Sequence, residues 1–130
     1  MSPPKLERIL LVEDDPDIQF IARMALQRIS GYQVEVCNNG IEALQKLPLF
    51  QPQMVVMDMM MPEMDGLTTF QEMRKIPAFA HLPVVIMTAK AQAHEIENYK
   101  REGIHDVIIK PFEPAELGKQ LEQIWQSLAR

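Results

Sequence analysis

Short apolar runs alternate along this chain with segments of helical periodicity. Three of the runs are apolar throughout, as expected of strands buried on both faces, and they cover residues 9–12, 54–57 and 84–87. Residues 33–36 alternate polar and apolar positions, which is typical of a half-exposed edge strand, and residues 107–109 form a fifth short run. The pattern therefore predicts five strands.

The intervening segments predict five helices. The first has the clearest start, because Asp15 is a capping residue, Pro16 suits the first helical position and Asp17 adds an acid to the first turn. The fourth is only weakly amphipathic, and we expect a marginal, mobile helix that ends at Gly103. The predicted helices cover about 16–30, 39–47, 65–75, 91–101 and 114–128, with a loop at 48–52.

Five strand–helix units in succession imply a parallel sheet with helices on both faces. The alternating second strand suits an edge, whereas the first, third and fourth strands are apolar enough for the interior. A strand order of 2-1-3-4-5 meets both conditions with right-handed crossovers. The predicted fold class is therefore α/β, with a doubly wound, five-stranded parallel sheet.

Composition and charge narrow the function. The chain has 130 residues, which suits one domain, and its net charge of −5 argues against general binding to nucleic acid or to acidic membranes. The single cysteine, Cys37, excludes an intrachain disulfide, and we expect a plain buried thiol. No stretch approaches the roughly 20 apolar residues of a membrane span, and the start lacks the apolar region of a secretion signal. We therefore expect a cytoplasmic protein.

Polar residues stand directly after the apolar strands. Glu13 and Asp14 follow the first strand, Asp58 the third, Thr88 the fourth and Lys110 the fifth. The carboxyl ends of parallel strands meet at one edge of a sheet, and ligands bind there at the point where the strand order reverses. We therefore expect these side chains to converge.

The converging groups suit phosphoryl chemistry. Two like unit charges about 4 Å apart cost about 4 kcal/mol at an effective dielectric near 20, so the carboxylates should retain a proton or attract a cation. Carboxylate oxygens with several waters are what Mg²⁺ prefers. A carboxylate can also attack phosphorus to form an aspartyl phosphate, and a lysine and a hydroxyl can steady the phosphoryl oxygens.

With these residues in place, the sequence closely resembles the receiver domain of bacterial two-component response regulators. The resemblance runs from about Glu7 to Leu128 and rests on four motifs in order, which are residues 11–15, 57–66, 87–89 and 110–112. It implies one receiver domain over residues 1–130 with a flavodoxin-like fold. It also implies a signalling switch that receives a phosphoryl group from a histidine kinase or a histidine phosphotransfer protein, and not an enzyme beyond its own phosphorylation and dephosphorylation.

The resemblance also implies roles for single residues, together with Mg²⁺ as the cofactor and Mn²⁺ as a substitute. The phosphoacceptor is Asp58, the metal ligands are Asp14, Asp58, the backbone carbonyl of Met60 and, through water, Glu13, and the phosphate-binding and switch residues are Thr88, Ala89 and Lys110. The Lys110–Pro111 bond is expected to be cis. One position departs from the family, because Val107 stands where receivers often carry an aromatic residue that reads out phosphorylation.

The same residues suit other functions less well. A phosphatase with an aspartate nucleophile needs a second aspartate two positions on, where this chain has Met60, and a flavin carrier would not place acids after the first strand. A receiver-like domain that binds partners without phosphate remains an alternative. The methionines near Asp58 could bind soft copper, but packing explains them better. His81, His94 and His105 lack metal-ligand spacing and are expected at the surface.

Overall fold

The predicted strands form one parallel sheet in a computed structural model, which describes residues 4–89 and 92–128. The strands are β1 (Arg8–Val12), β2 (Gln33–Cys37), β3 (Met54–Asp58), β4 (Val84–Thr88) and β5 (Asp106–Ile109). They lie in the order β2-β1-β3-β4-β5, and every neighbouring pair is parallel. The prediction of the fold class and of the strand order is confirmed.

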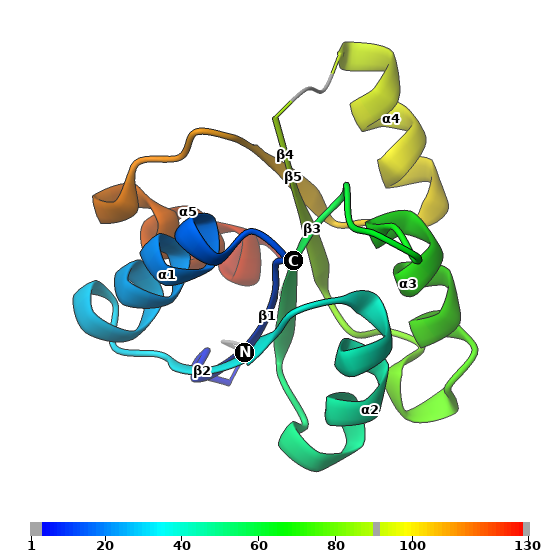
Figure 1. Ribbon diagram of the computed structural model, residues 1–130, viewed down its shortest axis with the longest axis horizontal. Coiled ribbons are helices and arrows are strands. Elements are labelled where there is room, and N and C mark those ends of the chain that lie inside the picture. The colour runs from blue at the N-terminus through cyan, green and yellow to red at the C-terminus, as the bar shows by residue number, and fades with distance from the viewer. Residues whose placement is uncertain (1–3, 90–91, 129–130) are drawn as a thin grey trace.

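Helices cover both faces of the sheet. They are α1 (Pro16–Met24), η1 (Ala25–Ile29, a π-helical continuation of α1), α2 (Gly40–Phe50), α3 (Gly66–Arg74), η2 (Pro77–Phe79, a 3₁₀ turn), α4 (Ala93–Glu102) and α5 (Pro114–Ser127). Figure 1 shows the sheet nearly edge-on, with α1 and α5 on one side and α2, α3 and α4 on the other. This is the layering that right-handed crossovers from a 2-1-3-4-5 order produce.

The helix starts follow their capping residues, but one predicted boundary is wrong. The prediction placed a loop at residues 48–52, whereas α2 continues through Pro48 to Phe50. Proline lacks one N–H and usually breaks a helix. Here Pro48 lies in the last turn of α2, so the helix loses only one hydrogen bond near its end. The helix ends at Gln51, whose left-handed backbone (φ 51°) lets its N–H bond to the carbonyl of Leu47. The start predicted for α4, Ala91, lies outside the described residues.

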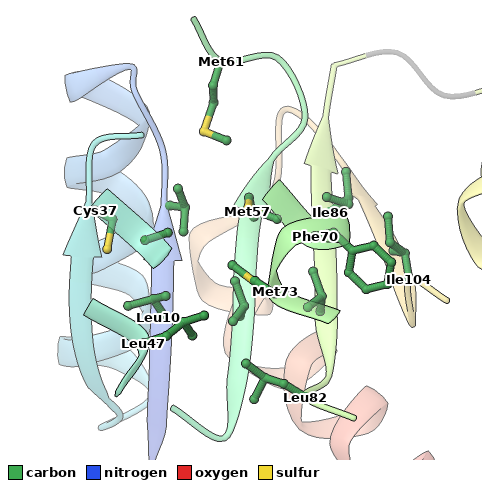
Figure 2. Packing of buried hydrophobic residues seen from close by; sticks show 14 of the residues in the cluster. Leu10, Cys37, Leu47, Met57, Met61, Phe70, Met73, Leu82, Ile86 and Ile104 are labelled. Atoms are coloured by element: carbon green, nitrogen blue, oxygen red, sulfur yellow. The ribbon is translucent and has the colours of Figure 1, made fainter. Parts of the chain in front are cut away.

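Two apolar clusters hold the layers together. One lies between the sheet and helices α2, α3 and α4, and Figure 2 shows its side chains, among them Leu10, Met57, Phe70 and Ile86. The other lies under α1 and α5. Burying one large apolar side chain stabilises a fold by roughly 1.5–3 kcal/mol, so the fully buried β3 and β4 anchor the sheet. Both strands end at the site described below.

None of the described helices combines the length and the apolar character needed to cross a membrane.

Candidate functional site

The predicted polar residues meet at the carboxyl edge of the sheet. Val12 pairs with Met57 in the β1–β3 ladder, so Glu13 leaves β1 level with Asp58 at the end of β3. Oxygen atoms of Glu13, Asp14 and Asp58 lie within 4.8 Å of one another. Because β1 and β3 flank the point where the strand order reverses, this acidic cluster lies where doubly wound sheets bind ligands.

A lysine from the far end of the chain joins the acidic cluster. Lys110 follows β5, and its Nζ donates to Glu13 Oε1 at 2.7 Å and to Asp58 Oδ1 at 3.0 Å. The Lys110 side chain is 12% exposed, against 0% for Glu13 and 8% for Asp58. Solvent therefore screens these ion pairs far less than it screens pairs at the surface. The bond between Lys110 and Pro111 is cis, as predicted.

The loop between β1 and α1 separates its three acids by environment. Glu13 is buried, and its Oε2 accepts a hydrogen bond from the backbone N–H of Asp15 at 3.2 Å. Asp15 caps α1, because its Oδ1 accepts from the N–H groups of Asp17 and Ile18. Asp14 is exposed, and its carboxylate lies near those of Glu13 and Asp58. The interpretation of Asp15 as a solvated cap is confirmed.

Burial and pairing shift the pKa values of two groups in the site. Burial raises the pKa of Glu13 to about 7, against the lowering effect of the hydrogen bond from Lys110. Burial alone would lower the pKa of Lys110, but its hydrogen bonds to Glu13 and Asp58 outweigh burial and leave that pKa raised. Glu13 therefore holds a proton more readily than an isolated carboxyl group does.

The acidic cluster has the donor chemistry of a hard divalent cation. Three carboxylates within reach of one ion offer the oxygen ligands that Mg²⁺ binds, and one of them, Asp14, keeps contact with solvent. The one positive charge on the Lys110 side chain does not neutralise the negative charge of the acidic cluster. The residues present therefore fit a magnesium ion.

The remaining predicted residues surround the cluster. Thr88 ends β4 and is buried, Ala89 follows it and is exposed, and the Met60 side chain points to solvent with 74% exposure. Val107 lies on β5, half-buried against the cluster that includes α4. The structure thus brings Glu13, Asp14, Asp58 and Lys110 together and places Thr88 at the neighbouring strand end.

A glycine lets the chain turn closely under the phosphoacceptor candidate. A Cβ on Gly66 would lie 2.6 Å from the carbonyl oxygen of Asp58 and 3.0 Å from Cα of Met59. The N–H of Gly66 also donates to the carbonyl of Met59. Both obstacles are backbone atoms that cannot move aside, so only glycine fits at this position.

Three features that the sequence singled out lie outside the site. Cys37 is buried, and burial raises the pKa of its thiol to about 12, which makes it unreactive. Met54 and Met57 are core residues, so packing explains them. His81 and His94 are exposed as predicted, but the prediction for His105 is wrong. Its half-buried ring accepts a hydrogen bond at Nδ1 from the N–H of Val84.

Sequence reasoning missed two polar residues beside the acidic cluster. Gln19 of α1 donates from Nε2 to the carbonyl oxygen of Glu13 at 2.8 Å and to Oδ1 of Asn38 at 3.0 Å. Glutamine and asparagine carry no motif at these positions. Gln19 follows the cap Asp15 by four residues, so helical spacing alone could have placed it above the loop.

The fold and the site define a class of protein, a doubly wound α/β domain whose acidic cluster and facing lysine can hold a cation and an anionic group together. The family profile of the response regulator receiver domain matches residues 9–122. A probable C4-dicarboxylate response regulator, DctR of Priestia megaterium, is 34% identical over 116 residues. The match covers 88% of this chain and 50% of that relative, so the chain spans about half the length of such a regulator.

Other relatives are closer in length, and solved structures share the fold. An uncharacterized 14.6 kDa protein of Leptolyngbya boryana is 36% identical, with 88% of this chain and 87% of that protein covered. The chemotaxis response regulator CheY4 of Vibrio cholerae superposes with a TM-score of 0.84 at 27% identity, over 92% of this chain and 99% of the other. The receiver domain of a sensor histidine kinase from Pseudomonas aeruginosa, with a magnesium ion coordinated in its active site cleft, gives 0.81 at 30% identity, over 93% and 98%.

The chain therefore belongs to the response regulator receiver domain family and is a receiver domain of two-component signalling. Members of this family are signalling switches and not conventional enzymes.

Proposed function

We propose that this receiver accepts a phosphoryl group on Asp58 in a Mg²⁺-dependent reaction and thereby changes its binding to partners. The observation that carries the proposal is the position of the Lys110 ammonium, which bridges Glu13 and Asp58 at 2.7 and 3.0 Å in a cluster of three carboxylates. A receiver domain over the whole of residues 1–130 is part of the same proposal.

The residues of the site divide the work of phosphoryl transfer. An oxygen of the Asp58 carboxylate attacks the phosphorus of a phosphohistidine, so that an O–P bond forms while the P–N bond breaks and the imidazole leaves. The Lys110 ammonium shifts toward the phosphoryl oxygens and pairs with them. The hydroxyl of Thr88 donates a hydrogen bond to one of these oxygens. Glu13 keeps its ion pair with Lys110, which holds the ammonium beside Asp58 during the change.

Asp14, Asp58 and the carbonyl of Met60 would hold the magnesium ion directly, and Glu13 through water. The bound ion would neutralise the negative charge that gathers on the transferring phosphoryl group. Support comes from the donor set of this chain and from the magnesium ion that the Pseudomonas aeruginosa receiver domain coordinates in its active site cleft. Mn²⁺, which also takes carboxylate and water ligands, would substitute.

An apolar groove next to Lys110 fits a protein donor. It has a volume of about 280 Å³ and is lined by Ile18, Ile21, Ala89, Lys110, Pro111 and Phe112. Phe20 and Met24 of α1 are also exposed apolar residues, at 64% and 40%. A histidine kinase or phosphotransfer protein bound in this groove would lie next to Lys110 and could reach Asp58. Such a donor acts in the cytoplasm, so a cytoplasmic location of this chain is part of the proposal.

Labelling by a small phosphodonor tests the proposal. Wild-type protein incubated with acetyl phosphate and Mg²⁺ should gain one phosphoryl group in intact-mass spectrometry, and Asp58→Asn and EDTA-treated protein should gain none. Asp15→Asn is the matched control, because it removes a carboxylate of the same loop and keeps the helix cap. Equal labelling of Asp58→Asn would refute the proposal. Unlabelled wild type that still binds partners would favour a phosphate-independent module.

A further inference from the structure

Hydrogen bonds fix the loop on both sides of Asp14. The peptide carbonyl before it, that of Glu13, accepts from Gln19 Nε2 at 2.8 Å. The peptide N–H after it, that of Asp15, donates to Glu13 Oε2 at 3.2 Å. The two peptide groups that set the direction of the Asp14 side chain are therefore both held by side chains of the same segment.

Gln19 also ties this loop to the neighbouring one. Its Nε2 carries two hydrogens, so the bond to Asn38 Oδ1 at 3.0 Å can form together with the bond to Glu13. Asn38 in turn donates to Glu42 of α2 at 3.3 Å. Lys46 pairs with Glu42 at 3.4 Å and donates to the carbonyl of Val36 in β2 at 2.9 Å. The Gln19 amide is therefore part of a polar network anchored in the sheet.

The acidic cluster needs such an anchor. Asp14 is exposed, and one of its oxygens lies within 4.8 Å of oxygens of Asp58 and Glu13, so negative charge on these groups is repulsive. Repulsion among these acids favours movement of the loop toward solvent, where Asp14 is already exposed. Ligand groups of a metal site bind best when neighbouring hydrogen bonds hold them in place before the ion arrives.

We infer that Gln19 is a positioning residue, which holds the loop of Glu13 and Asp14 in the conformation that presents Asp14 to a divalent cation. This inference rests on the proposed function. The Gln19 amide donates to the Glu13 backbone carbonyl and to Asn38, and not to a carboxylate of the acidic cluster, so we expect it to act on the affinity for Mg²⁺ and not on the transfer step. Loss of its amide should raise the Mg²⁺ concentration that phosphorylation requires and leave the rate at saturating Mg²⁺ unchanged.

Gln19→Met tests the inference, because methionine has a similar length and no donor. Binding of Mg²⁺ alone is measured by calorimetry and by the amide NMR shifts of residues 13–15. The expected loss of affinity is roughly 3- to 10-fold, the range that one hydrogen bond contributes. Gln27→Met is the matched control. Gln27 also lies on the first helical segment and also donates to a backbone carbonyl, that of Val34, away from the loop.

Every result of these Mg²⁺-binding measurements either supports or overturns the inference. Weaker Mg²⁺ binding in Gln19→Met, with Gln27→Met at the wild-type affinity and with full labelling of both by acetyl phosphate at saturating Mg²⁺, supports the inference. An unchanged Mg²⁺ affinity of Gln19→Met overturns it and leaves the proposed function standing. Equal weakening of Mg²⁺ binding in both variants assigns the effect to the helix and also overturns the inference. Wild-type protein that binds no Mg²⁺ refutes the proposed function itself.

Discussion

The pKa of Glu13 predicts how the stability of the protein without Mg²⁺ depends on pH. Burial raises this pKa from 4.5 to about 7, so the folded protein favours the protonated form more than the unfolded chain does. The contribution of Glu13 to stability is therefore greatest below pH 4.5 and falls as pH rises toward 7. One pKa unit is worth about 1.4 kcal/mol, so the full loss is about 3 kcal/mol, and roughly 2 kcal/mol of it falls between pH 5 and pH 8.

Glu13→Gln removes this titration and keeps the shape of the side chain. The lost acceptor toward Lys110 or Asp15 lowers the stability of the variant by an amount that does not depend on pH. The free energy of unfolding is measured by urea denaturation at pH 5 to 8 with EDTA. The stability of the variant relative to wild type should rise by roughly 2 kcal/mol between pH 5 and pH 8. Asp15→Asn serves as the control and should show no such trend. A constant difference between Glu13→Gln and wild type would refute the reasoning.

Three further predictions concern Gly66, His105 and helix α4. Gly66→Ala should lower the stability by roughly 1–3 kcal/mol and impair labelling, because its Cβ meets the Asp58 carbonyl; urea denaturation and intact-mass labelling check both. Burial, and then Arg74, lower the pKa of His105, so its contribution is present above pH 6.5 and lost as pH falls further. His105→Gln should flatten that acid loss in urea denaturation, and an unchanged profile would contradict this. Phosphorylation should alter amide hydrogen exchange across α4, because Val107 cannot swing as an aromatic residue does; changes confined to the surroundings of Asp14 and Asp58 would exclude that route.

The sequence predicts the strands and the positions of the polar residues at their ends well, because both depend on local rules. Apolar runs such as residues 54–57 are strands wherever both faces are covered, and the polar residue after each run necessarily reaches the same edge of a parallel sheet. Asp58 and Lys110 are therefore placed together although 52 positions separate them. Their roles in phosphorylation remain proposals.

Tertiary contacts decide what the sequence did not predict. The low helix propensity of Pro48 predicts a loop, yet α2 continues past it to Phe50 and ends at the left-handed Gln51. His105 has no motif, and its half-buried ring follows from its place beside the start of β4. Gln19 is a common surface residue by type, and its bond to the Glu13 carbonyl exists because α1 lies over the loop.

Chemical trapping of the acyl phosphate tests the central claim most directly. Borohydride reduces an aspartyl phosphate to homoserine, so protein labelled by acetyl phosphate and Mg²⁺ can be reduced, digested and sequenced by mass spectrometry. The account predicts homoserine at position 58 and unmodified carboxylates at Glu13, Asp14 and Asp15. Reduction at one of those three acids, or a phosphoryl group that borohydride does not release, would contradict it.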